Sequence, residues 1–328
     1  MASIRKRGDR WQVQVKVGGR RKSKTFATKA AAVAWVRETE IELEDAIAGK
    51  IPNKTFGDLL RRYSMEVTPT KRGAAREQKF INRFLGNKAL ADLSLRELAP
   101  RHIAAWRDAR LREVSGSTVC REMNILSHAC RVAAREWGWL RESPVSLVSR
   151  PKASPPRHRR PAEDEIEALR IASGYSDNVP PVERQQRVIA AFLFAIETGM
   201  RCGEIAGLRR CDVHERHVHL PVTKNGTARD VPLSSRARAL LDHVMEATDP
   251  PDVFGLTRQS IDALFRKMRD RAGIVDLHFH DSRHEAATRL SKKLGVMELA
   301  RMLGIRDLKI LSQVYYNPTI DELADRLD

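Results

Sequence analysis

The stretch that decides the fold reads TGMRCGEIAGL from Thr198 to Leu208, and it follows the apolar run 188–197. That run predicts a buried helix, and Gly199 is expected to end it because glycine readily adopts the left-handed conformation of helix C-termini. A second short helix is expected over 202–208. Arg201 therefore lies at the junction of two helices, where a guanidinium can leave the helix end and face a ligand.

Glu204 follows Arg201 by three residues, so the two side chains share one helix face. A carboxylate at this spacing can hold and orient the guanidinium through a charge-assisted hydrogen bond. The same spacing is equally typical of an ordinary surface ion pair, and both interpretations stay open on these residues alone.

A β-hairpin is predicted next, with a lysine at its tip. Residues 218–222 alternate apolar and polar side chains, and Asn225-Gly226 is a strong signal for a hairpin turn. Val231 continues the return strand. Lys224 lies beside the turn, so its ammonium projects from the hairpin tip, as an ordinary exposed lysine there would also do.

The segment LHFHDSRHEAATRL, residues 277–290, predicts a helix start that can bind an anion. Asp281 or Ser282 can cap a helix that runs to about Leu294. His280 and Arg283 are three residues apart, so they can reach one ligand at the helix N-terminus, which itself favours negative charge. The spacing alone is weak, because His128 and Arg131 repeat it elsewhere.

The C-terminal segment MLGIRDLKILSQVYYNPT, residues 302–319, ends in a tyrosine pair. Gly304 is expected to stop a short apolar helix, and Asn317-Pro318 stops regular structure after the pair. Tyr315 can leave the core at this point and reach a ligand. The pair is equally compatible with packing against a C-terminal helix.

The chain is strongly basic, with 59 Lys+Arg against 42 Asp+Glu and a formal net charge of +17 over 328 residues. Such an excess suits a polyanion, most simply nucleic acid, through phosphate contacts and counterion release. A ribosome-associated or merely soluble basic protein would show the same balance. The length allows two or three domains with their own cores.

The cysteines are scattered and form no CxxC pair: Cys120, Cys130, Cys202 and Cys211. This argues against zinc and against a disulfide framework, so no metal site is expected and a reducing cytoplasm fits. The N-terminus lacks an apolar core of signal-peptide length. The best membrane-span candidate, 188–196, is too short to cross a bilayer, so no membrane partner is expected.

Residues 1–50 are predicted to form a small sheet-plus-helix module. Residues 11–17 alternate as a half-buried strand between turn signals, so segments 4–7 and 22–26 can pair with it. Thr28 can cap a helix that covers one face. The other face is either a strand-based reader of a DNA groove or a plain solvated surface, and it carries Arg5, Arg7, Gln12, Gln14 and Lys16.

The remaining chain divides at a basic, proline-rich segment. Residues 53–148 follow helical periodicity and predict an all-α domain. Residues 149–161, SRPKASPPRHRRP, predict a linker whose basic side chains suit a strap over DNA. Residues 162–328 combine mostly helical segments with the hairpin, which predicts a mainly α (α+β) domain with a small antiparallel sheet.

In their order along the chain, these motifs resemble the tyrosine recombinase (phage integrase) family. The likeness rests on TGMRCGEIAGL, TKNGTARDVPL, HFHDSRHEAATRL and MLGIRDLKILSQVYYNPT, and four ordered motifs are highly specific together. Residues 116–145 resemble the family's core-binding domain, and residues 1–50 resemble its arm-binding module. The resemblance covers nearly the whole chain and implies a multidomain integrase from a phage or another mobile genetic element.

The resemblance implies a role for each residue of the cluster. Tyr315 would attack the scissile phosphate and form a 3′-phosphotyrosine, which conserves the bond energy, so neither ATP nor any metal or other cofactor is implied. Arg201 and Arg283 would hold the non-bridging oxygens. Lys224 would protonate the leaving 5′-oxygen, and His280 would act as general acid/base.

A supporting role is implied for Glu204, which would orient Arg201, and two features depart from the family pattern. Ile305 stands where the family usually has His or Trp, and isoleucine cannot donate a hydrogen bond to the phosphate. Losing one such donor costs roughly 3–4 kcal/mol in other enzymes. The gap from Ile305 to the tyrosine pair is one residue longer than usual. The VYYNPT context favours Tyr315, and Tyr316 stays an alternative nucleophile.

As partners, the resemblance implies double-stranded DNA attachment sites and a homotetramer on that DNA, with accessory DNA-bending proteins as further candidates. The setting would be the cytoplasm of a bacterial host, at the nucleoid. A recombinase-fold DNA-binding regulator with weak or lost cleavage is the alternative that Ile305 favours. A type IB topoisomerase would share the chemistry. A metal-dependent nuclease would need clustered carboxylates, and none stand out near the basic residues.

Overall fold

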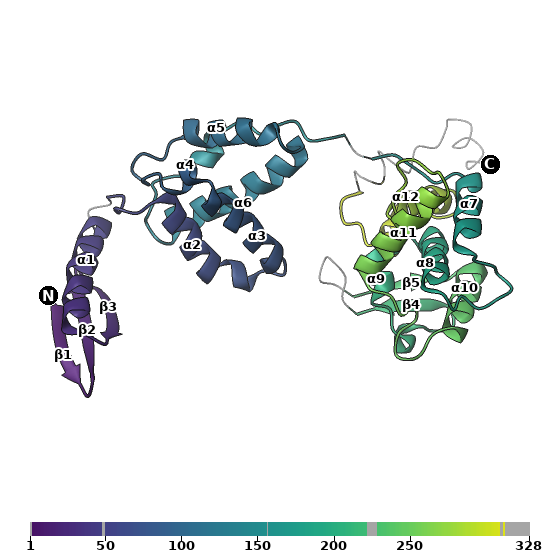
Figure 1. Ribbon diagram of the computed structural model, residues 1–328, viewed down its shortest axis with the longest axis horizontal. Helices are drawn as coiled ribbons and strands as arrows, with labels where there is room; N and C mark the ends of the chain where they lie inside the picture. The colour runs from purple at the N-terminus through teal and green to yellow at the C-terminus, as the bar shows by residue number, and fades with distance from the viewer. Residues whose placement is uncertain (1, 48–49, 156, 222–227, 309–310, 312–328) are drawn as a thin grey trace. The chain divides into compact units, whose positions relative to one another are not determined.

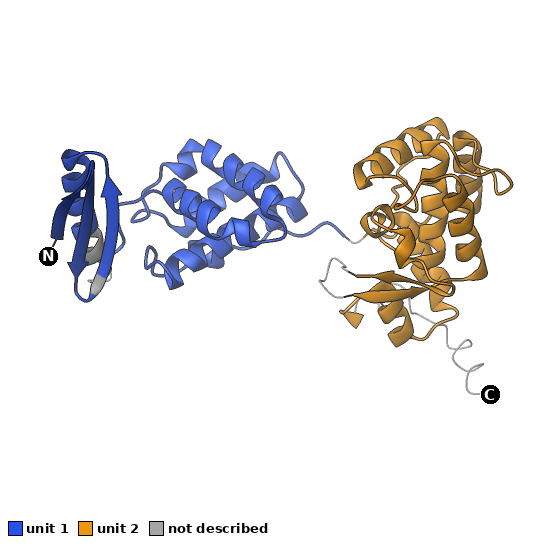
Figure 2. Ribbon diagram, turned by 90° about the horizontal axis from the view of Figure 1, so that it is seen from below, with its two compact units in different colours: residues 1–155 blue, residues 156–328 orange. Residues whose placement is uncertain are grey.

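The computed structural model describes residues 2–47, 50–155, 157–221, 228–308 and 311. The chain forms two compact units, residues 1–155 and residues 156–328, which Figure 2 colours separately. The division falls inside the segment 149–161 that the sequence predicts as a linker. The finer division into 1–50, 53–148, 149–161 and 162–328 remains a prediction.

The N-terminal sheet has three antiparallel strands in the order β1 (Ala2–Arg7), β2 (Arg10–Val17) and β3 (Arg20–Phe26). Helix α1 (Lys29–Ile47) packs on one face of this sheet, as Figure 1 shows. Val13 and Val15 of β2 are fully buried under it, because they are the inward members of the alternating strand. The sheet and its covering helix therefore agree with the sequence-based prediction.

The strand register places the predicted DNA-facing side chains on the other face of the sheet. Arg5 pairs with Gln12, and Ile4 pairs with the buried Val13. Since side chains alternate across a strand, one face collects all five predicted residues, Arg5, Arg7, Gln12, Gln14 and Lys16, and Arg10 with them.

Helices make up the rest of the first unit: α2 (Phe56–Glu66), α3 (Ala74–Gly86), α4 (Lys88–Ala91), α5 (Pro100–Leu111) and α6 (Gly116–Arg135), with 3₁₀ turns at Thr68–Thr70 and Pro144–Leu147. An apolar stripe of α6 lies in their core, where Val119, Met123 and Leu126 are fully buried. The helical periodicity predicted for residues 53–148 is thus confirmed in the longest helix of this region.

Two arginines of this unit make hydrogen bonds within it. Arg110 donates to the fully buried Glu122 from Nε at 3.0 Å and from Nη2 at 3.1 Å. Arg107 donates to the backbone oxygen and to Oγ of Ser149, both at 2.8 Å. These contacts hold the helices and the start of the linker together, so the two guanidiniums serve the fold.

The second unit is built around α8 (Arg184–Thr198), in which every residue from 188 to 196 is buried. Its neighbours are α7 (Glu163–Ser173), α10 (Ser235–Glu246), α11 (Arg258–Arg271) and α12 (Asp281–Ser291), as Figure 1 shows. The unit also contains the shorter α9 (Cys202–Ala206), a 3₁₀ turn at Arg210–Asp212 and α13 (Val296–Leu303). Strands β4 (His217–Leu220) and β5 (Arg229–Pro232) pair antiparallel, as the hairpin pattern predicts. Over the residues that the structure describes, the unit is mostly helical with one small sheet.

The start of α12 differs from its prediction. Its N-cap residue is His280, and neither Asp281 nor Ser282 caps it. The Asp281 carboxylate accepts instead from the backbone N–H of His278 at 2.8 Å and from the side chain of Arg157. The Asp281 carboxylate, which the local sequence predicts as a helix cap, is therefore used in an ion pair with the distant Arg157.

Candidate active site

Arg201 lies at the helix junction that the sequence predicts. Helix α8 ends at Gly199, whose φ of 63° is left-handed, and Arg201 then caps α9 with extended backbone. A side chain at Gly199 would overlap Leu303 of α13, so glycine is required for both conformation and space. This close approach brings the ends of α8 and α13 together beside Arg201.

Glu204 holds Arg201 as predicted. Their ion pair is not an ordinary surface pair, because the carboxylate is buried. Its Oε2 accepts from the Arg201 backbone N–H at 2.9 Å, and its Oε1 accepts from Arg201 Nη1 at 2.8 Å. The Glu204 side chain is only 8% exposed. The carboxylate is thus a buried support that fixes both the backbone and the guanidinium of Arg201.

Arg229, which the sequence reading did not single out, completes this support. Its Nη1 and Nη2 donate to the two oxygens of Glu204 at 2.9 and 2.8 Å, and its Nε donates to the Met302 carbonyl at 3.1 Å. The bidentate pair joins β5 to α9, and the bond from Nε joins β5 to α13. The informative signal was its position on the return strand of the hairpin, five residues after Lys224.

The two arginines keep Glu204 ionised. Burial raises its pKa, but the hydrogen bonds from Arg229 and from the Arg201 backbone outweigh this and lower the pKa to about 2. Arg201 is therefore oriented by a permanent negative charge, and its side chain remains about one quarter exposed.

Arg283 is fixed by backbone carbonyls from the same two helix ends. Its side chain is nearly buried, its Nη1 donates to the Gly199 carbonyl, and its Nη2 donates to the Leu303 carbonyl at 2.6 Å. These are C-terminal carbonyls of α8 and α13, which carry partial negative charge. Arg283 is therefore held by the ends of α8 and α13, whereas Arg201, two residues after Gly199, is held by Glu204.

His280 stands directly before α12, one turn from Arg283. Partial loss of hydration lowers its pKa, and the positive charges of Arg283 and Arg201 lower it further, while Asp281 opposes them. The ring meets His284 edge-on, with centroids 6.0 Å apart. At neutral pH His280 is therefore a neutral imidazole, which can accept a proton.

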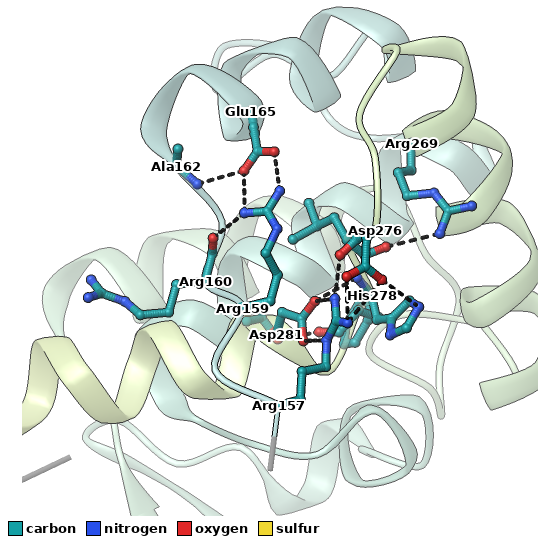
Figure 3. Close-up of polar contacts among 12 residues, drawn as sticks. Arg157, Arg159, Arg160, Ala162, Glu165, Arg269, Asp276, His278 and Asp281 are labelled. Atoms are coloured by element: carbon teal, nitrogen blue, oxygen red, sulfur yellow. Dashed lines mark hydrogen bonds and ion pairs between the residues drawn. The ribbon is translucent and has the colours of Figure 1, made fainter. Parts of the chain in front are cut away.

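The end of the predicted linker binds the start of α12, and Figure 3 shows the contacts of Arg157 and Arg159. Arg157 donates from Nε and Nη2 to the two oxygens of Asp281 at 2.8 and 2.7 Å, and from Nη1 to Asp276 at 3.0 Å. Arg159 pairs with Glu165, and Arg160 donates to the buried Glu285 at 2.7 Å. These three arginines of the predicted strap are thus paired with carboxylates of the second unit, and their contact with DNA remains a prediction.

Four predicted site residues remain, and the structure describes only one of them, Ile305. Ile305 follows the C-terminus of α13, where its backbone N–H donates to the Ala300 carbonyl at 3.0 Å and its half-buried side chain packs on an apolar cluster with Leu299 and Leu303. Lys224, Tyr315 and Tyr316 lie outside the described residues. The structure thus brings together Arg201, Glu204, His280 and Arg283.

Comparison with known proteins decides the family. A Haemophilus influenzae protein provisionally named an integrase/recombinase is 42% identical over 98% of this chain and 89% of its own length. The family model described as the phage integrase family matches residues 162–322. The chain belongs to the phage integrase family. The shufflon-specific DNA recombinase of Escherichia coli is a further relative, 35% identical over 85% of this chain and 73% of its own length.

Solved structures of integrases share the fold of this family member. A lambda integrase dimer bound to a COC' core site superposes with a TM-score of 0.68 over 96% of this chain and 94% of that one, at 18% identity. A Tn1549 transposon integrase in complex with circular intermediate DNA gives a TM-score of 0.66 over 84% of this chain and 99% of that chain, at 15% identity. The integrase-like, mostly helical fold with small antiparallel sheets therefore holds for this chain.

The described residues contain no group of three or more His, Cys, Asp or Glu side chains placed to hold a metal ion. Among the described helices, none has both the length and the apolar composition to cross a bilayer.

Proposed function

We propose that this chain is a site-specific DNA recombinase, an integrase that cuts and rejoins DNA through a 3′-phosphotyrosine intermediate. The observation that carries the proposal is the fixed position of two guanidiniums, Arg201 held by Glu204 and Arg283 held by the end carbonyls of α8 and α13, with His280 beside them. Two guanidiniums and an imidazole held in this way suit a phosphodiester whose negative charge grows in the transition state.

The chemistry assigns one task to each group. The Tyr315 hydroxyl oxygen forms a bond to the scissile phosphorus while the bond from phosphorus to the 5′-oxygen breaks. His280 takes up the tyrosine proton as general base, and Lys224 supplies a proton to the leaving 5′-oxygen. Arg201 and Arg283 stabilise the non-bridging oxygens. Reversal by a 5′-hydroxyl of the partner strand rejoins the DNA.

Neither a metal nor ATP belongs to this proposal, because the phosphotyrosine keeps the energy of the broken bond for the rejoining step. The free phenol of a tyrosine has a pKa near ~10, so Tyr315 depends on the surrounding cations for activation. Glu204 acts through Arg201 as a positioning residue, since it binds the guanidinium.

Duplex attachment-site DNA is the proposed partner, bound by a homotetramer in the bacterial cytoplasm at the nucleoid. A lambda integrase tetramer bound to a Holliday junction has the same fold, with a TM-score of 0.67, which supports this assembly. The face with Arg5, Arg7 and Gln12 is proposed to read a DNA groove. Accessory DNA-bending proteins remain candidates for the complete reaction.

The proposal is tested by trapping the covalent intermediate. The chain is incubated without metal with a nicked duplex that spans the junction between the mobile element and the host chromosome. Wild type and Tyr316→Phe are expected to form a protein–DNA adduct, whereas Tyr315→Phe is expected to form none. An adduct that survives in Tyr315→Phe but not in Tyr316→Phe moves the nucleophile to Tyr316.

A DNA-binding regulator with weak or lost cleavage is the second candidate, and the position of Ile305 favours it. The isoleucine packs on apolar side chains and offers the phosphate no side-chain donor. Specific binding of the junction duplex with no adduct from the nicked substrate would select this candidate. Ile305→His is then expected to restore adduct formation, because it returns a hydrogen-bond donor to this position.

A further inference from the structure

The first unit contains a polar pocket that is separate from the site described above. Its volume is about 310 Å³, and its walls include Lys71, Arg131, Arg150, Glu77, Asn124 and His128. Three cations face one carboxylate, so the lining carries an excess positive charge even when the histidine is neutral. A pocket of this composition suits an anion.

A hydrogen-bond relay fixes the histidine of this pocket. Tyr63 is fully buried, and its hydroxyl lies 2.7 Å from His128 Nδ1. Lys71 Nζ donates to the same hydroxyl and bonds both carboxylate oxygens of Glu77 at 2.9 Å. An ammonium only donates, so the tyrosine oxygen accepts from Lys71 and its proton is directed to Nδ1. The neutral imidazole then carries its own hydrogen on Nε2.

This direction of the relay assigns the ring hydrogen of neutral His128 to Nε2, which makes Nε2 a donor. Burial lowers the pKa of His128, and the charges of Lys71 and Arg131 lower it further, so the ring is neutral near pH 7. Nδ1 is occupied by the tyrosine, which leaves the Nε2–H to donate to another acceptor. Because Lys71 only donates, the proton of the buried Tyr63 hydroxyl still requires an acceptor, and His128 Nδ1 supplies it.

The arginines of the pocket come from two segments. Arg131 follows His128 by one helical turn on α6 and is exposed. Arg150 belongs to the linker, and its Nη1 donates to Asn124 Oδ1 at 2.7 Å and to the Cys120 carbonyl at 3.3 Å. The guanidinium of Arg150 is thus fixed on α6, on the same helix face as Asn124, His128 and Arg131.

We infer that this pocket binds one backbone phosphate of duplex DNA, with His128 Nε2–H, Arg131 and Arg150 as the donors and Tyr63 as the residue that sets the tautomer. A phosphodiester offers two non-bridging oxygens that accept from an imidazole and from guanidiniums together. The choice of DNA over a free phosphate rests on the proposed function and on the excess of 59 Lys+Arg over 42 Asp+Glu in the chain.

The test measures duplex affinity without cleavage, in the Tyr315→Phe background of the full chain. Arg131→Gln removes one exposed cation, so the slope of log affinity against log salt is expected to fall by about 0.9. Arg141→Gln, a charge-matched change at an exposed arginine outside the pocket lining, is the control. Tyr63→Phe is expected to weaken binding about 3-fold to 10-fold with no change of slope, because it removes no charge and frees the tautomer.

A methylphosphonate scan of the duplex identifies the contact. One neutralised phosphate is expected to weaken binding by wild type and by Arg141→Gln, and to have no further effect on Arg131→Gln. If a methylphosphonate at every position weakens duplex binding by Arg131→Gln as much as binding by wild type, the pocket does not bind DNA. If 50 mM inorganic phosphate at constant ionic strength raises the Tm of wild type but not of Arg131→Gln, the site is one for a small anion and the DNA assignment is overturned. The covalent-adduct test is independent of both outcomes.

Discussion

At the scale of single residues, Glu204 shows how a strongly basic chain positions its arginines. The carboxylate accepts from Arg201 and from Arg229, and one of its oxygens serves both guanidiniums at 2.8 and 2.9 Å. Without this negative charge, two cations would lie together in a largely buried place. We therefore regard the carboxylate as the reason why Arg201 can face a ligand while Arg229 stays inside.

Glu204→Gln is expected to destabilise the second unit at neutral pH. The folded-state pKa of about 2 lies well below the ordinary value of 4.5. A depressed carboxylate pKa contributes stability above the unfolded-state value, here about 3 kcal/mol, and loses it as the pH falls toward the folded-state pKa. Thermal unfolding at pH 7 should show a Tm that is lower by roughly 6–12 °C.

The pH dependence of this difference is the critical observation. The gap in Tm between wild type and Glu204→Gln should be complete above about pH 5 and should narrow between pH 4.5 and 2. Glu66→Gln, at an exposed helix-surface ion pair with Arg62, is the control and should change Tm little. A gap that stays constant down to pH 3 would show that the charge of Glu204 is not what stabilises the unit.

At the scale of elements, the contact between the ends of α8 and α13 is the point on which the site depends. Gly199→Ala should cost about 1–2 kcal/mol for the left-handed backbone and about 1–3 kcal/mol more for the overlap with Leu303. Gly273→Ala is the matched control, because Gly273 has a φ of 68° with no atom near its missing side chain. Thermal unfolding measures the fall in Tm of both variants. Equal falls would show that the overlap with Leu303 does not add to the cost of Gly199→Ala.

How much the sequence predicts at this scale depends on the range of each interaction. The glycine that ends α8, the strands around the hairpin and the buried face of α6 follow from periodicity and turn chemistry, which act over a few residues. The partners of Arg157 and Arg160 do not, since Asp281 and Glu285 lie 124 and 125 residues further along the chain. Among 59 Lys+Arg, no local rule selects these pairs.

The short range of local sequence signals also explains which residues of the candidate site were predicted. Arg201, His280 and Arg283 were found because each lies at a helix end that local signals predict. Arg229 was missed because its role comes from Glu204, on another element, 25 residues away in sequence. Order and context along the chain therefore predict the groups that face a ligand better than the groups that hold them.

At the scale of the whole molecule, the segment 149–161 is bound along most of its length. Within the first unit, Ser149 accepts from Arg107, and the backbone N–H of Ser154 donates to Ser117 Oγ at 2.8 Å. Within the second unit, Arg157 binds Asp281, next to His280. Only two residues separate the anchored Ser154 from the anchored Arg157, so the connection between the units ends directly under the helix that carries His280 and Arg283.

This arrangement predicts that Arg157→Gln impairs cleavage more than DNA binding. The change leaves the Asp281 carboxylate, which is 1% exposed, without its cationic partner and loosens the start of α12. Small displacements of reacting groups cost up to about 100-fold in rate, so adduct formation on the nicked duplex should slow by about 10-fold to 100-fold. Duplex affinity should stay within about 3-fold. Arg159→Gln, which removes the same charge from the partner of Glu165, should slow adduct formation less than 3-fold. If Arg157→Gln and Arg159→Gln slow the reaction equally, or if duplex affinity falls in parallel with the rate, Arg157 acts through charge on DNA and not through the position of α12.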